Sequence, residues 1–272
     1  MRRSFCLSLA VLLLAACNPS HPPAPPVPPA PAVVNPALSA ASTAAHQAAA
    51  RFMALAKGSS QSGHAPAAAD PAVGPLLDLV FDTASVPTEP VPLSQLDEIN
   101  DWVRSVISVG RTYVLAGTGA APYDDPTGPV VEAQVVKNVA AYGPEVGRYI
   151  DAQNALLALE ASSLLRQQAA DPTWPRDPAA AKGLATMRSN LTLGLGAMLE
   201  LLAQPSLTDD WRRDRMPYLL SLATQVAKLG DAADIATVRA KIQTTYNATD
   251  DATEKADLQY LALTLDAAGG GS

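Results

Sequence analysis

The sequence predicts an all-α protein, an irregular bundle of about seven or eight helices behind a disordered proline-rich tether. From residue 71 onward, large apolar residues recur every three or four positions, which is the period of one face of an α-helix. Clusters of Gly, Pro and Asp interrupt this pattern where helices are expected to end. Both cysteines, Cys6 and Cys17, lie in the first 17 residues, so the folded region must be stabilised by an apolar core rather than by disulfides.

Residues 1–16 have the layout of a secretory signal peptide. Arg2 and Arg3 provide a charged start, and the apolar run from Phe5 to Leu14 is shorter than the roughly 20 residues that a membrane span requires. Small residues then lead into Leu14-Ala15-Ala16-Cys17. This stretch resembles the signal of bacterial lipoproteins, whose lipobox ends in a Leu, two small residues and an invariant Cys. The resemblance covers residues 1–18 only.

The resemblance implies that Cys17 carries a diacylglycerol thioether and becomes the first residue after cleavage. Two or more acyl chains, palmitate among them, would then hold the protein on a membrane of the bacterial cell envelope without a transmembrane helix. Asn18 rather than Asp follows the Cys, which favours the periplasmic face of the outer membrane over the inner membrane. An ordinary cleaved signal, with Cys17 incidental, is the alternative. Arg2-Arg3 also leaves twin-arginine export open beside general secretion.

Three segments are expected to precede the folded domain. Residues 17–36 form the tether, because nine of the 24 prolines fall there and favour an extended polyproline II spacer. A proline-rich recognition ligand is the alternative reading of this tether. Residues 37–57 are rich in alanine and poor in large apolar residues, which predicts a fragile or isolated helix, with docking through the turn around Phe52 as the alternative. Residues 58–70, which contain Gly-Ser-Ser-Gln-Ser-Gly, predict a flexible linker.

The all-α domain is predicted over residues 71–268, with a loop around Trp174 dividing it into halves at 71–170 and 177–268. Its first helix follows Pro71. Ser94 is expected to cap the second helix, with Asp97 three residues on in a near capping-box arrangement. Residues 269–272 form a flexible tail.

The central part of the domain is predicted to be helical despite its valines. β-Branched residues favour strands, but the five valines between residues 130 and 139 follow a spacing of three to four. Gly143-Pro144 separates this helix from one that runs to about Ala170. A further helix, from Pro178 to about Ala203, is apolar nearly all round at residues 191–202, which predicts a central position. Its Gly194 and Gly196 are expected to admit a neighbouring backbone.

The last helices are predicted from their caps. Thr208 is expected to cap a helix start. Met216 precedes Pro217 and is expected to leave the helical region, so that the main helix begins at Pro217. Asp231, and then Asp250 or Asp251, begin the final two helices.

The residue inventory excludes several chemistries from the predicted domain. The three histidines, His21, His46 and His64, all precede residue 71. The domain therefore lacks the residues for Ser-His-Asp or Cys-His catalysis and for a His/Cys zinc site, and no phosphate-binding glycine loop is present. We expect no metal, no cofactor and no enzymatic activity. After residue 16 the chain has 17 basic and 26 acidic residues, which argues against nucleic acid as a partner.

Trp211-Arg212-Arg213 is the one dense basic and aromatic run, and it is the candidate contact for an envelope protein partner. Alternatively, Trp211 packs inside and the arginines pair with nearby aspartates. The function predicted is a membrane-anchored helical domain with a non-catalytic interaction or structural role. Two alternatives remain open: binding of a small apolar or lipid-like ligand between helices, in a pocket above roughly 300 Å³, and a carboxylate-dependent hydrolase with two convergent acids.

Overall fold

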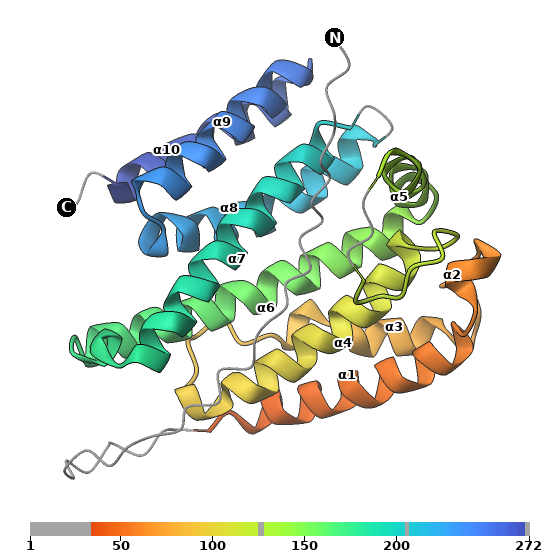
Figure 1. Ribbon diagram of the computed structural model, residues 1–272, viewed down its shortest axis with the longest axis horizontal. Coiled ribbons are helices and arrows are strands. Elements are labelled where there is room, and N and C mark those ends of the chain that lie inside the picture. The colour runs from red at the N-terminus through yellow and green to blue at the C-terminus, as the bar shows by residue number, and fades with distance from the viewer. Residues whose placement is uncertain (1–33, 125–127, 205–206, 270–272) are drawn as a thin grey trace.

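The computed structural model describes residues 34–124, 128–204 and 207–269 (Figure 1). Within these ranges the chain is helical and has no strand, which confirms the all-α prediction. The eight longer helices are α1 Pro36–Leu55, α4 Leu96–Val114, α5 Pro129–Ala141, α6 Gly143–Ala170, α7 Pro178–Leu202, α8 Asp209–Leu229, α9 Ala232–Ala248 and α10 Ala252–Gly269. Short α2 Ser59–Ser62, α3 Gly74–Val80 and the 3-10 turns η1 Thr83–Ser85, η2 Leu93–Gln95 and η3 Trp174–Arg176 connect them. Cys17 and most of the predicted tether lie outside the described residues.

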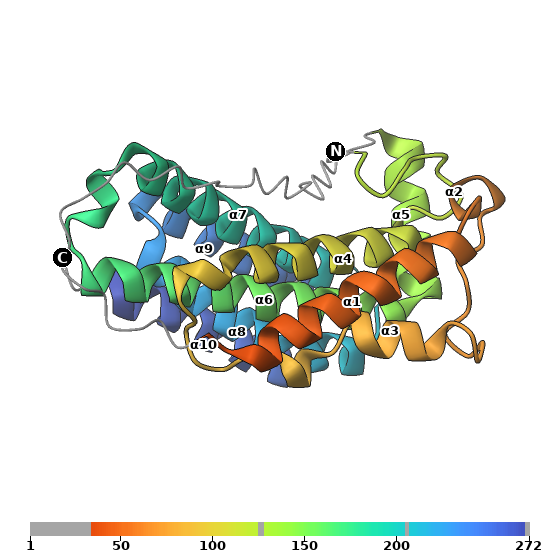
Figure 2. The same cartoon turned by 90° about the horizontal axis from the view of Figure 1, so that it is seen from below.

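Helix α6 is the centre of the arrangement. On one side it packs against α4, which in turn contacts α1, and α3 lies against α1 (Figure 2). On its other side α6 packs against α8, and α7, α9 and α10 complete that layer. The two predicted halves of the domain therefore share the surface of one long helix.

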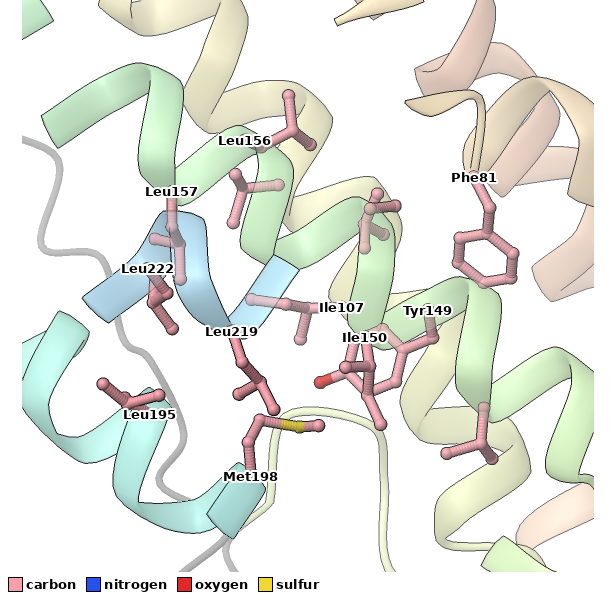
Figure 3. Close-up of a cluster of buried hydrophobic side chains, with 14 of the residues drawn as sticks. Phe81, Ile107, Tyr149, Ile150, Leu156, Leu157, Leu195, Met198, Leu219 and Leu222 are labelled. Atoms are coloured by element: carbon pink, nitrogen blue, oxygen red, sulfur yellow. The ribbon is translucent and has the colours of Figure 1, made fainter. Parts of the chain in front are cut away.

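The core between α6, α7 and α8 is aliphatic. Leu195 of α7 and Leu219 of α8 are fully buried and lie in one cluster with Leu157 of α6 (Figure 3). The central position predicted for residues 191–202 is confirmed on one face, where leucines three or four positions apart, Leu191, Leu195, Leu199 and Leu202, are buried. The opposite face is not covered, because Leu193 keeps 46% of its surface exposed.

Helix α1 belongs to the core, which corrects the expectation of a fragile or isolated helix at 37–57 and agrees with the alternative of docking through Phe52. Leu38, Ala45 and Phe52 are fully buried, and the Phe52 ring lies 5.7 Å from that of Tyr113 in α4. The Ser42 hydroxyl donates to the carbonyl oxygen of Glu98 at 2.7 Å. Alanine carries little apolar area, but its small side chain lets two helices approach closely, and it is this approach that buries α1.

Residues 58–70 also contact the domain rather than linking to it loosely. The Tyr113 hydroxyl donates to the Pro66 carbonyl at 2.8 Å, and the backbone N–H of Ala65 donates to the Tyr142 hydroxyl at 3.1 Å. The Gly119 N–H donates to the Ser60 carbonyl at 2.8 Å. These bonds fix the segment against the ends of α4 and α5, so the Gly and Ser content predicted more freedom than the structure shows.

Two predicted helix boundaries are wrong because contacts with distant parts of the fold outweigh the local signals. Ser94 lies inside η2 and makes no cap, and α4 begins at Leu96. Its neighbour Gln95 is 1% exposed and exchanges two hydrogen bonds with the backbone of Asn35. Helix α8 continues through Pro217, because the residues around the proline, Met216 and Leu219, are both buried against the core.

Candidate functional site

Trp211 of α8 is anchored against α6. Its indole N–H donates to the Gly143 carbonyl at 2.8 Å, and the Arg215 guanidinium lies over its ring, 5.4 Å from the centroid. Gly147, one turn after Gly143, provides the space for this contact. A Cβ at Gly147 would lie 2.0 Å from an Arg215 nitrogen and 3.3 Å from the Trp211 nitrogen. We call these four residues, together with Asp151, the α6–α8 cradle.

Asp151 and Arg215 form the buried ion pair of the cradle. The Arg215 Nε and an Asp151 carboxylate oxygen are 2.7 Å apart, and their side chains are 12% and 9% exposed. Burial raises the pKa of Asp151 to about 7, since the loss of solvation outweighs the attraction of Arg215, and the charge of Asp214 adds to the rise. A buried ion pair of this kind contributes little net stability, but removing one partner leaves an uncompensated charge.

The other two residues of the predicted contact diverge from Trp211. Arg212 is 11% exposed, donates to the Gln204 carbonyl at 2.7 Å and pairs with Asp209 at 2.8 Å. Arg213 is 46% exposed and pairs with Asp210. Consecutive residues on an α-helix are turned by about 100° from each other, so three in a row do not share one surface. The structure therefore supports the alternative, in which Trp211 packs and the arginines pair with aspartates.

A second buried carboxylate lies further along α6. Glu160 is 7% exposed, and burial alone raises its pKa to about 7. It lies nine residues from Asp151, a separation of about 13 Å along the helix axis. This exceeds the roughly 5–10 Å that separate the two carboxylates of a glycosidase, so these two acids do not converge as the hydrolase alternative requires.

An inter-helix cavity of about 60 Å³ lies between the end of α4, α5, the first half of α6 and the second half of α7. It is far smaller than the roughly 300 Å³ expected of a pocket for a drug-sized ligand. Gly194 lines it, and a Cβ at Gly194 would meet no atom within 4 Å. The prediction that Gly194 admits a neighbouring backbone is therefore wrong. At Gly196 the approaching group is also not backbone but the Lys241 side chain.

Within the described parts of the chain, no group of three or more His, Cys, Asp or Glu side chains is arranged to hold a metal ion. None of the helices described is both long enough and apolar enough to cross a membrane. Searches for similar proteins give no match to a protein-family model, to a curated protein or to a solved structure.

The sequence did not reveal the cradle or the cavity. Gly143 and Gly147 have the four-residue spacing of small residues at close helix contacts, and this spacing is the signal that could have pointed to the cradle. The pairing of Asp151 with Arg215 joins positions 64 residues apart in sequence, and one sequence gives no sign of it.

Proposed function

We propose that this protein is a lipid-anchored lipoprotein of the bacterial cell envelope. Its all-α domain would face the periplasm, most favourably from the outer membrane, and serve a non-catalytic interaction or structural role. The observation that carries the proposal is the lipobox Leu14-Ala15-Ala16-Cys17 directly after a short apolar run. The acidic balance of the rest of the chain would make an anionic membrane repel the domain, so that attachment would depend on the lipid and not on charge.

The folded domain supports a role in binding rather than in chemistry. Two buried carboxylates pair within the fold: Asp151 with Arg215, and Glu254 at the start of α10 with Thr249 at the end of α9, whose hydroxyl donates at 2.6 Å. Large apolar side chains are exposed on α10, where Tyr260 and Leu263 are 61% and 62% exposed. A helical surface of this kind suits contact with another envelope protein, and Arg213 is the member of the predicted contact that such a partner could reach.

The anchor is tested by replacing one sulfur. Cells that produce the native chain or Cys17→Ser are labelled with radioactive palmitate and fractionated. The native protein should take up label and sediment with membranes, whereas the serine variant should remain unlabelled. An unlabelled native protein that fractionates like the serine variant would contradict the proposal.

A further inference from the structure

The proline-rich tether meets the fold at Asn35, directly before α1. Among the described residues, Asn35 is the first that forms a hydrogen bond to the rest of the chain. A pull on the proposed anchor, Cys17, would therefore enter the described fold at this residue. The Asn35 side chain also caps α1, because its Oδ1 accepts from the N–H groups of Ala37 at 3.1 Å and of Leu38 at 3.2 Å. Asn35 is thus the point at which the tether, α1 and the rest of the domain are connected.

Gln95 binds the backbone of Asn35 on both sides. The Asn35 N–H donates to Gln95 Oε1 at 2.6 Å, and Gln95 Nε2 donates to the Asn35 carbonyl at 2.9 Å. Because both bonds end on the backbone of one residue, a pull along the tether acts on the two bonds at once. Gln95 is 1% exposed, and hydrogen bonds shielded from solvent open less readily than exposed ones. We call Asn35 and Gln95 the tether clamp.

The tether clamp lies where a pull would begin to peel α1 from the domain. Ser42 contacts Glu98 near the starts of α1 and α4, and both helices start at the same end of the molecule (Figure 1). Phe52 contacts Tyr113 near their ends, so the two helices run in the same direction. A pull at Asn35 would therefore separate the buried residues of α1 one turn at a time, and each turn would resist alone. Chain ends open at little cost unless they are tied down.

The tether clamp transmits force to a helix that is fixed in the core. Gln95 directly precedes α4, which packs against α6. Trp102 of α4 is 1% exposed, and its indole N–H donates to the Val80 carbonyl of α3 at 2.9 Å. Near the C-terminal end of the described chain, by comparison, α10 is tied to α9 by Arg239 and Asp266, a solvent-exposed ion pair of a kind that contributes little. The two ends differ as expected if the domain is pulled from its N-terminal side.

We infer that the tether clamp is a force-bearing contact, which keeps the domain folded when the lipid anchor and a bound partner are pulled apart. The inference rests on the proposed function, because such a pull requires both an anchor and a partner. Force enters at Asn35 and passes through the Gln95 side chain into α4, so that α1 is not peeled away. A residue that only stabilised the fold would matter equally for every direction of pull.

Force spectroscopy on single molecules in optical tweezers tests the tether clamp. The chain from residue 17 onward is held by its one thiol, Cys17, and by its C-terminus. Gln95→Met keeps an unbranched side chain without the two hydrogen bonds, and should release α1 in an early step at low force. The 20 residues of α1 should lengthen by about 40 Å in that step, from helix to extended chain. The native chain should show no such step before its main unfolding event.

Two controls separate a force-bearing contact from one that only stabilises the fold. In the first, the thiol is moved beyond α1 to an exposed position, by Lys57→Cys in a Cys17→Ser chain, so that the pull bypasses the tether clamp. Gln95→Met should then leave the force at first rupture unchanged. In the second, Thr245→Val removes a buried bond between helices, from Thr245 Oγ1 to the Leu199 carbonyl at 2.9 Å. This variant should show no early step when pulled from Cys17.

The native chain alone can overturn the inference, by releasing α1 in an early step when pulled from Cys17. It is also overturned if Gln95→Met shows no early step, if Thr245→Val shows the same step, or if Gln95→Met lowers the force at first rupture equally with the thiol at residue 57. None of these measurements involves lipid, whereas failure of the proposed anchor would appear in the palmitate labelling of Cys17.

Discussion

The two sides of α6 are held by different chemistry. Toward α4 the contact is apolar and depends on complementary shape. Gly110 of α4 faces the ring of Tyr149, and a Cβ at Gly110 would lie 2.1 Å from a ring carbon. Toward α8 a glycine also makes room, but Gly147 receives the guanidinium of Arg215 and its ion pair with Asp151. Shape complementarity stabilises the first contact, and paired charges and hydrogen bonds specify the second. The layer of α1, α3 and α4 should therefore tolerate changes of pH better than the layer of α7 to α10.

The largest loss of stability is expected in the layer of α1, α3 and α4. Phe52→Ala removes a fully buried ring that packs against Tyr113, and should lower the free energy of unfolding by about 3–5 kcal/mol. Urea denaturation followed by far-UV circular dichroism measures it. A loss under about 1 kcal/mol would show that α1 is not part of the cooperative core.

A matched pair of substitutions compares the two sides directly. Gly110→Ala places its methyl against ring atoms next to the Tyr149 backbone, which cannot move without shifting α6. Gly147→Ala meets the end of the Arg215 side chain, which is held in its ion pair with Asp151 but can shift without moving a helix backbone. Both substitutions gain about 1 kcal/mol from the higher helix propensity of alanine. After this gain, we expect the free energy of unfolding to fall by about 3 kcal/mol for Gly110→Ala and by about 1 kcal/mol for Gly147→Ala. Equal losses in urea denaturation would remove the distinction between the two contacts.

The buried carboxylates predict how stability depends on pH. The pKa of Glu160 is raised from 4.5 to about 7 and that of Asp151 from 3.8 to about 7. Since the folded state binds these protons more tightly than the unfolded chain, both groups favour folding at low pH, and this contribution is lost as pH rises through 7. Glu160→Gln should therefore stabilise the protein by about 1–2 kcal/mol at pH 8 and change little at pH 4.5.

Thermal unfolding between pH 4.5 and 8 tests this dependence. The unfolding temperature of Glu160→Gln should fall less steeply with rising pH than that of the native chain. Glu89→Gln is a suitable control, because it makes the same change of side chain at a residue that is exposed. The same slope in the native chain and in Glu160→Gln would show that Glu160 is not the group that titrates.

The smallest change in stability is expected for substitution of Arg213, on the solvent side of α8. It is 46% exposed and pairs with Asp210, which is 84% exposed, so Arg213→Ala should change stability by less than about 0.5 kcal/mol. Trp211→Ala, two positions away, removes the indole bond to Gly143 and should destabilise measurably. Equal stability losses for the two variants would contradict the separation of packed and exposed residues along α8.

The period of the apolar residues was sufficient to predict helices, and it did so even where valines suggested a strand, in α5. It failed where close packing depends on small residues. The alanines of α1 carried too little apolar area to predict a core helix, yet Ala45, Ala48 and Ala49 are buried. Local rules also failed at Pro217, where packing on both sides outweighs the cost of a proline in a helix.

The candidate site was predicted less well, for a geometric reason. Trp211, Arg212 and Arg213 are adjacent in sequence, but the helix turns them toward α6, toward the carbonyl of Gln204 and toward solvent. The contacts that build the cradle and the inter-helix cavity join distant positions, and those pairings depend on how α6 packs against its neighbours.

The most direct test of the membrane anchor is the mass of the mature N-terminus. Protein purified from native membranes is digested, and its N-terminal peptide is analysed by mass spectrometry. The account predicts a peptide that begins at Cys17 and carries a diacylglycerol group on the sulfur. A mature chain that begins elsewhere, or a Cys17 with an unmodified thiol, would contradict it.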